Sequence, residues 1–182
     1  MTNGKMNSRQ KILAAAEELA WEVGPGHLSL DAVAQRAGVS KGGLLYNFPN
    51  KARLLEALVE QHLSEFEVAL NEKEKLHEEQ PNSTGRAYLE LFVTDLEQRQ
   101  PPPSGVLAAM AEDPSFLVPV KRFNRTLLDR LKASAKNANA ALILFLALEG
   151  MRSLRLFDVD VLSLAERDAV IASLEAILEN DA

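Results

Sequence analysis

The sequence contains no cysteine among its 182 residues. Disulfide bonds, thiolate metal sites and cysteine nucleophiles are therefore excluded. The longest apolar run, AALILFLAL at residues 140–148, is less than half as long as the roughly 20 residues that a membrane-spanning helix needs. The beginning of the chain is polar and then amphipathic, without the apolar segment of a signal peptide. We therefore expect a cytoplasmic protein.

Signatures of catalysis and of cofactor binding are also missing. The three histidines stand on separate segments, without partners at metal-ligand spacing, and no nucleophile-elbow motif is present. Residues 38–43 have the two glycines of a phosphate loop, but Leu44 and Leu45 follow where lysine and serine or threonine are required. We expect no enzymatic activity, no catalytic residue, no metal and no cofactor.

Negative charge is in excess, with a net charge of −6, but the excess is unevenly distributed. Residues 1–53 carry seven basic and four acidic side chains, whereas the remainder carries 13 basic and 22 acidic ones. Such asymmetry is typical of a polyanion-binding module joined to a second, unrelated module. Chance fluctuation remains the alternative explanation.

Helical periodicity runs through almost the whole sequence, and no alternating strand pattern is found. We predict an all-α fold of about nine helices, with caps at Asn7 (with Gln10), Ser29, Ser40, Asn50 and Ser163. The predicted helices lie at about 7–24, 30–37, 41–46, 51–79, 86–99, 105–112, 115–135, 138–157 and 164–180. Breaks are expected at 80–85 (QPNSTG) and at 100–105 (QPPPSG).

The second and third predicted helices are separated only by a short turn that contains Gly38. This spacing is typical of a helix-turn-helix, whose second helix enters the major groove of DNA. Gly42 and Gly43 stand side by side in that short helix, where each costs roughly 0.5–1 kcal/mol relative to alanine. We interpret them as positions where DNA comes close to the backbone.

Polar side chains around these glycines suit contacts with DNA. Lys41 supplies a positive charge, Tyr46 a hydroxyl group, and Asn47 an amide that can pair with adenine. Ser29 and Lys51 stand at helix starts, where free N–H groups favour a phosphate. Alternatively, the serines and Asn50 serve only as caps, and Asn47 ends its helix in a left-handed conformation.

The segment from Ile12 to Glu60, and above all AGVSKGGLLYNFPNK followed by LL, resembles the tetracycline-repressor-like (TetR) family of bacterial transcription regulators. The resemblance implies a helix-turn-helix DNA-binding domain at 1–53 and a helical effector-binding and dimerisation domain at 54–182, connected by the helix at 51–79. Asn47 stands where the family often has histidine, and Leu45 adds bulk, so the sequence that is read is open. The DNA contacts that the resemblance implies are Ser29, Ser40, Lys41, Gly42, Gly43, Tyr46, Asn47 and Lys51.

The resemblance also implies a function. A regulator of this kind binds a palindromic operator in double-stranded DNA as a homodimer, because one recognition helix reads too few bases. We expect a repressor that a small, largely apolar effector releases from its operator. A ligand-dependent activator, a corepressor-dependent regulator, and a dimeric interaction protein without specific DNA binding are the alternatives.

The second domain offers candidates for effector binding and for dimerisation. Arg125, Glu149 and Arg152 could orient a ligand, although surface ion pairs would explain them equally well. The large apolar candidates for the effector site, which could equally form ordinary core, are Phe92, Leu96, Met110, Phe116, Phe123, Leu127, Phe145 and Met151. The candidates for the dimer interface, with the same alternative, are Ala140, Leu144, Ala147, Met151, Ala169, Ala172, Ala176 and Ile177.

Overall fold

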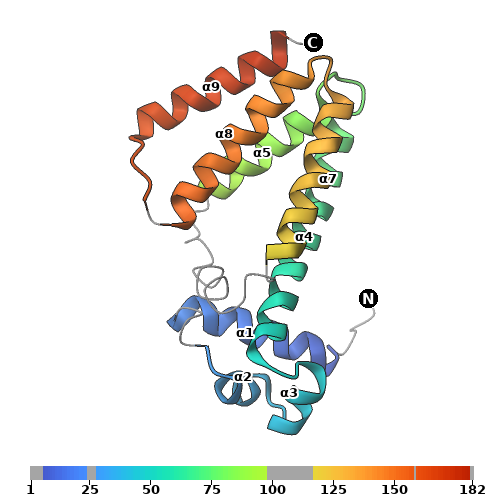
Figure 1. Cartoon of the computed structure of the whole chain (residues 1–182), viewed down its shortest axis with the longest axis vertical. Coiled ribbons are helices and arrows are strands. Elements are labelled where there is room, and N and C mark those ends of the chain that lie inside the picture. Colours follow the sequence, from blue (N-terminus) through green and yellow to red (C-terminus); the bar gives the residue numbers. More distant parts are fainter. Residues whose placement is uncertain (1–5, 24–27, 98–116, 158, 181–182) are drawn as a thin grey trace. The chain divides into compact units, whose positions relative to one another are not determined.

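The structure is a computed structural model that describes residues 6–23, 28–97, 117–157 and 159–180. Within these ranges every regular element is an α-helix, which confirms the predicted all-α fold (Figure 1). The helix that was predicted at 105–112 lies outside the described residues. The elements are α1 (Ser8–Val23), α2 (Leu30–Ala37), α3 (Lys41–Asn47), α4 (Lys51–Leu76), α5 (Ser83–Glu97), α7 (Val118–Ser134), α8 (Ala138–Leu156) and α9 (Leu164–Asn180).

The helix starts follow the predicted caps. Before α1, Asn7 and Gln10 exchange bonds between side chain and backbone at 3.0 and 2.9 Å. Before α9, Ser163 and Glu166 form the same reciprocal pair. These bonds satisfy N–H groups that have no partner inside the helix. Local sequence is therefore sufficient to position these two starts.

One predicted boundary is wrong, because the helix expected after 80–85 begins at Ser83 and includes Gly85. A Cβ atom at Gly85 would lie 2.9 Å from the side chain of Leu178 and 3.1 Å from that of Leu144. The glycine thus lets α5 pack closely on α8 and α9 and does not act as a breaker. The turn before α5 is made by Asn82, with a φ of 61° and a buried side-chain bond of 3.0 Å to the backbone oxygen of Leu178.

The chain divides into two compact units, and the division falls within α4. Of the described residues, the first unit holds those up to His62 together with 117–120, and the second holds 63–97 and 121–180. The first part of α4 belongs to the first unit because Leu54, Leu55 and Ala57 are buried in its core.

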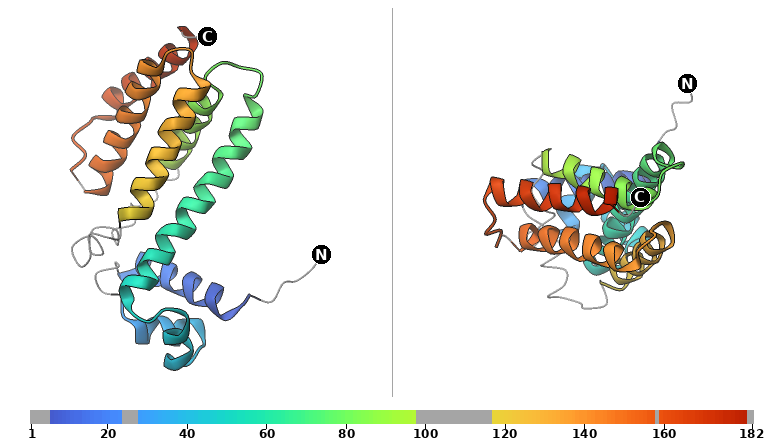
Figure 2. Two further views of the ribbon diagram at one scale, coloured as in Figure 1. Left: turned by 45° about the vertical axis from the view of Figure 1, so that its right-hand side comes forward. Right: turned by 90° about the horizontal axis from the view of Figure 1, so that it is seen from above.

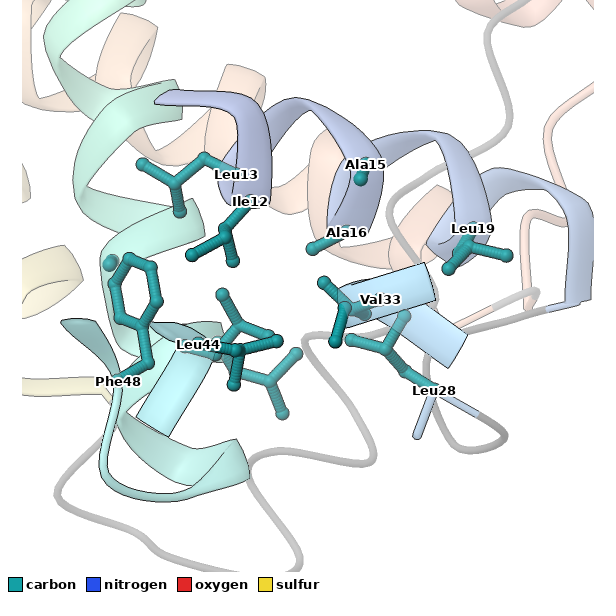
Figure 3. Packing of buried hydrophobic residues seen from close by; sticks show 13 residues of the cluster. Ile12, Leu13, Ala15, Ala16, Leu19, Leu28, Val33, Leu44 and Phe48 are labelled. Atoms are coloured by element: carbon teal, nitrogen blue, oxygen red, sulfur yellow. The ribbon is translucent and has the colours of Figure 1, made fainter. Parts of the chain in front are cut away.

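Among the described residues, four helices build the core of the first unit, and each of them contributes a fully buried side chain (Figure 3). Ile12 of α1, Val33 of α2, Leu44 of α3 and Leu54 of α4 all have 0% exposure. Since burying such a side chain contributes about 1.5–3 kcal/mol, this cluster fixes the orientation of the short helix α3.

The core of the second unit lies among α5, α8 and α9, which pack on one another, and it extends to α7 and the second half of α4 (Figure 2). Tyr88 and Phe92 of α5 are its largest fully buried side chains. Phe66 of α4 packs edge-to-face on Phe123 of α7, with ring centroids 5.7 Å apart. Over the described residues, none of the helices combines the length and the apolar content that crossing a bilayer requires.

Candidate functional site

The third helix, α3, separates its buried and exposed residues cleanly. Leu44 is fully buried, and Phe48, directly after the helix, is 3% exposed, so both anchor α3 on the core of the first unit. On the other side, Tyr46 is 90% exposed and Leu45 is 37% exposed. An aromatic side chain so fully in water contributes nothing to the core. The outer surface of α3 is therefore available for a partner.

The two glycines of α3 differ in their surroundings. A Cβ atom at Gly42 would meet nothing within 4 Å, so the chain itself has no need of glycine there. A Cβ at Gly43 would lie 3.2 Å from the hydroxyl oxygen of Ser40. That oxygen accepts the Gly43 backbone N–H at 3.0 Å as the cap of α3. Gly43 thus has an internal reason that the sequence did not reveal, whereas Gly42 has none.

The positive charge at the start of α3 has a partner in the free protein. Lys41 Nζ lies 2.9 Å from Oδ1 of Asp31 in α2, and both side chains are exposed. Exposed ion pairs of this kind contribute about 0–1 kcal/mol. A DNA phosphate can therefore replace the Asp31 carboxylate at little cost.

Arg36 of α2 does not face the same surface freely, because it binds two carboxylates of α1. Its guanidinium donates to Glu22 at 2.7 Å and to Glu18 at 3.3 Å. The hydrogen bond from Arg36 holds the pKa of Glu22 below its ordinary value. Arg36 is one of the seven basic residues among the first 53, but it forms ion pairs between α2 and α1.

The hydroxyl groups of Ser29 and Ser40 both act as helix caps. Ser29 Oγ accepts from the Ala32 N–H at 3.1 Å, as Ser40 does from Gly43. A capping hydroxyl still has its own hydrogen to donate, so these bonds leave room for a phosphate contact. Lys51 begins α4 and is half-buried.

The side chain of Asn47 is turned back onto its own helix. Its Nδ2 donates to the backbone oxygen of Gly43 at 2.8 Å. The alternative in which Asn47 ends α3 in a left-handed conformation is wrong, since Asn82 is the only non-glycine residue with positive φ in the described part of the chain. One amide hydrogen of Asn47 is thus occupied by its own helix.

Two features of this surface were missed by reasoning from the sequence. The roles of Asp31 and Arg36 as ion-pair partners depend on how α1, α2 and α3 cross, which no local pattern encodes. The exposure of Leu45 could have been found, since the inward spacing of Leu44 and Phe48 directs the intervening residues outward.

The described effector candidates all lie in the core of the second unit. Phe92, Leu127 and Met151 are buried, while Leu96, Phe123 and Phe145 are half-buried against the same cluster. Met110 and Phe116 lie outside the described residues. Of the charged candidates, Arg125 forms an exposed ion pair with Asp129. Glu149 and Arg152 contact each other near Tyr88, a residue that the sequence reasoning did not single out.

The dimer candidates divide between inner and outer surfaces. On α8, Ala140, Leu144 and Met151 are buried within the unit itself, and Ala147 is half-buried, so this row packs inside the chain. On α9, Ile177 packs on the same core. In contrast, Ala169, Ala172 and Ala176 of α9 are exposed. The apolar residues that α8 exposes are Ile143 and Leu146, at 53% and 66%.

Both units match models of known protein families. Residues 12–58 match the model described as bacterial regulatory proteins of the tetR family. Residues 82–179, more than half of the chain, match the model described as the tetracyclin repressor-like C-terminal domain. The first match covers the segment whose motifs carried the resemblance in the sequence.

Individual relatives agree with these matches. The nucleoid occlusion factor SlmA of Vibrio cholerae is 41% identical over 59 residues, which are 32% of this chain and 30% of that protein. The multidrug binding protein EbrR, solved with malachite green, has 20% identity, covers 93% of this chain and 97% of its own, and has a TM-score of 0.70. A transcriptional regulator from Rhodococcus sp. Rha1 has 20% identity, 96% coverage of both chains and a TM-score of 0.68. At such identities the two solved structures show the shared fold.

Proposed function

The chain belongs to the tetracycline-repressor (TetR) family of bacterial transcription regulators, and on that premise we propose that it is a repressor which binds a palindromic operator as a homodimer and is released by a small effector. It acts in the cytoplasm, where bacterial DNA lies. The largely apolar core of the second unit, with its buried aromatic side chains, supports a largely apolar effector.

The observation that carries this proposal is the outer surface of α3. Gly42 is exposed and has no neighbour that would exclude a side chain, and the 90% exposed Tyr46 follows one turn later. A residue that costs helix stability without serving the fold is explained when another molecule approaches the backbone there. The groove of DNA is the partner that suits a helix-turn-helix.

The proposed DNA contacts divide into two groups. Ser29, Ser40, Lys41 and Lys51, at helix starts, bind phosphates and set the position of the protein on DNA. The other polar residues and the glycines of α3 face the major groove and supply the sequence preference. That group consists of Gly42, Gly43, Tyr46 and Asn47.

The homodimer is proposed to form through α8 and α9. Ile143, Leu146 and Gly150 recur at helical spacing on the exposed side of α8, and a Cβ at Gly150 would meet nothing within 4 Å. On α9 the small exposed residues Ala169, Ala172 and Ala176 also share one face. Small residues beside large apolar ones allow helices of two subunits to cross closely. The dimer face of α8 is thus proposed to lie beside the row that the sequence suggested, roughly a quarter of a turn around the helix.

Release of DNA is proposed to occur by a shift between two conformations. The helix α4 is continuous from Lys51 to Leu76 and contributes to the cores of both units. An effector that binds the second unit better in one position of α4 changes the separation of the two recognition helices. Its differential affinity then disfavours the operator-bound state.

Selection of bound sequences from a random double-stranded DNA pool tests the proposal. We expect purified protein to recover an inverted repeat whose half-sites lie about one helical turn, or a multiple of it, apart. Failure to recover any motif, both alone and with cell extract that supplies a corepressor, would contradict specific DNA binding. Expression of the gene beside the recovered site should rise when this protein is deleted, whereas an activator would give a fall.

A further inference from the structure

A charged cluster lies among the aromatic side chains of the second unit. Arg152 of α8 places its guanidinium 5.3, 5.6 and 5.9 Å from the ring centroids of Phe66, Tyr88 and Phe92. Three rings from α4 and α5 thus surround one cation. The Arg152 side chain nevertheless keeps 34% of its surface accessible, so part of it faces solvent. An arginine in such a position contributes charge where the rest of the site contributes apolar surface.

The carboxylate beside Arg152 already accepts several hydrogen bonds. Glu149 Oε1 accepts from the Tyr88 hydroxyl at 2.5 Å and from Arg152 Nη1 at 2.9 Å, and Oε2 accepts from Asn124 at 3.3 Å. Burial is the largest cause that raises the pKa of the Tyr88 phenol, which therefore stays protonated and donates. Glu149 is thus held by three donors from three helices.

The other end of the guanidinium is unsatisfied. Arg152 Nη2 is buried and has no hydrogen-bond partner among the residues that the structure describes. The carboxylate of Asp95 in α5 stops 4.0 Å away, beyond hydrogen-bond distance, and its side chain is 55% exposed. An unpaired buried donor on a charged group is unfavourable, and an added acceptor removes that cost.

We propose that the effector is an aromatic or similarly apolar carboxylic acid, whose carboxylate takes the place of the exposed Asp95 carboxylate and accepts a hydrogen bond from Arg152 Nη2, while its apolar body packs on the half-buried ring of Phe66. This inference rests on the proposed function in assuming that the second unit binds an effector. It adds the chemical class of that effector. A carboxylate matches the planar donors of arginine, and such bonds are roughly twice as strong as neutral ones.

The same contacts disfavour a cationic effector. A cation would need the charge of Glu149, which the Arg152 guanidinium already neutralises and the Tyr88 hydroxyl also contacts. It would also meet the positive charge of Arg152 within the same ring of aromatic side chains. An acid meets two like charges, but Asp95 is exposed and can turn into water, and Glu149 already accepts from three donors.

Calorimetric titration of the full chain with two molecules of the same shape provides the test. Naphthalene-2-carboxylate carries the charge, and naphthalene-2-carboxamide is its neutral counterpart. We expect the acid to bind about 10- to 100-fold more tightly than the amide, the range that corresponds to a hydrogen bond with a charged group. Equal binding of the two, no binding of the acid at millimolar concentration, or preferential binding of malachite green that Glu149→Gln abolishes would overturn the proposal.

Three variants test which residues cause the tighter binding of the acid. Arg152→Gln should reduce acid binding to the level of the amide. Asp95→Asn should strengthen acid binding several-fold and leave amide binding unchanged, because it removes a like charge near the bound carboxylate. Arg125→Gln removes an exposed arginine of α7 outside the cluster and should change neither. Should Arg152→Gln melt early, the Asp95→Asn result decides, since loss or no gain of acid binding would contradict the assignment.

The outcome is separable from that of the proposed function. If an operator is recovered but acid and amide bind equally, the proposed regulator is supported and the acid effector is contradicted. If the acid binds better in a way that depends on Arg152 but no operator is recovered, the acid site is supported and the regulator is contradicted.

Discussion

The two glycines of α3 have different roles. Gly43 leaves space for the hydroxyl group of Ser40, which caps the helix through the Gly43 N–H. Gly42 leaves space that nothing in its surroundings fills. The first is therefore a feature of the fold, and the second is best explained by a partner that approaches the backbone.

Replacement of Gly42 by alanine should separate stability from DNA binding. In Gly42→Ala the new methyl group enters open space and the unfolded chain loses freedom, so the free energy of unfolding should rise by roughly 0.5 kcal/mol. Operator affinity should fall, because the methyl group occupies the position of the approaching groove. Urea denaturation and fluorescence anisotropy with labelled operator measure the two effects. In Gly43→Ala, by comparison, no gain in stability is expected; unchanged DNA affinity in Gly42→Ala would remove the reason given for this glycine.

Removal of the partner of Lys41 should strengthen DNA binding without changing its specificity. Asp31→Asn frees the Lys41 ammonium group for phosphate and removes a nearby negative charge. Affinity should rise about two- to fivefold for operator and for unrelated DNA alike, and more at low salt. Asp129→Asn makes the same change in net charge in the second unit, where Asp129 pairs with Arg125. If Asp129→Asn has the same effect, net charge rather than the Lys41 pair is responsible.

At the scale of elements, ion pairs hold α2 on α1. The guanidinium of Arg36 reaches Glu22 and Glu18 across the two helices, beside an apolar contact that contains Val33 and Ile12. The apolar contact supplies most of the stabilisation, since both ends of the ion pairs are exposed. The pairs instead contribute a dependence on pH.

The contact between Arg36 and Glu22 should weaken in acid. Its hydrogen bond holds the pKa of Glu22 below the ordinary value of 4.5, so the contribution to stability is present above about that pH and is lost as pH falls through the lowered pKa. Glu22→Gln should therefore make the melting temperature fall less between pH 7 and pH 3 than it does in the wild type. Thermal melts followed by circular dichroism measure this. Glu17→Gln, at an exposed position of the same helix, is the control; an equal flattening there would contradict the assignment to the Arg36 contact.

At the scale of the whole molecule, α8 has one apolar surface inside the second unit and a second apolar surface that is exposed. Leu144 is fully buried in the second unit, whereas Leu146, two residues later, is 66% exposed. Large exposed apolar side chains that recur along one helix mark a surface that another molecule covers. A second copy of the chain is the partner that the proposed palindromic operator requires.

Two nearby leucines of α8, Leu144 and Leu146, should therefore respond differently to substitution. Leu146→Asp should convert the dimer to monomer and abolish tight operator binding while leaving the melting transition cooperative, as sedimentation equilibrium and thermal melts will show. Leu144→Ala should instead destabilise the folded chain by about 2–5 kcal/mol, because it opens a cavity in the core. A dimer that persists in Leu146→Asp would place the interface elsewhere.

Local sequence determined the features that depend on neighbours along the chain. The caps at Asn7, Ser29, Ser40 and Ser163, the left-handed Gly38 between α2 and α3, and hence the helix-turn-helix follow from residues within a few positions of each bond. The family resemblance followed from the same short segment. Such features can be predicted from the sequence because the two partners of a local hydrogen bond stand at a fixed spacing along the chain.

Only the tertiary structure decided which side of each long helix faces inward. The period of α8 was visible, but an apolar helix offers several faces, and packing on α5 and α9 selected the one with Leu144. Packing likewise placed Gly85 inside α5, where the side chains of Leu144 and Leu178 exclude a Cβ, and it brought Arg152 to Tyr88 from a distant part of the chain. Contacts between segments far apart in sequence depend on how helices cross, and this crossing is set by the shapes of all the side chains that share the core.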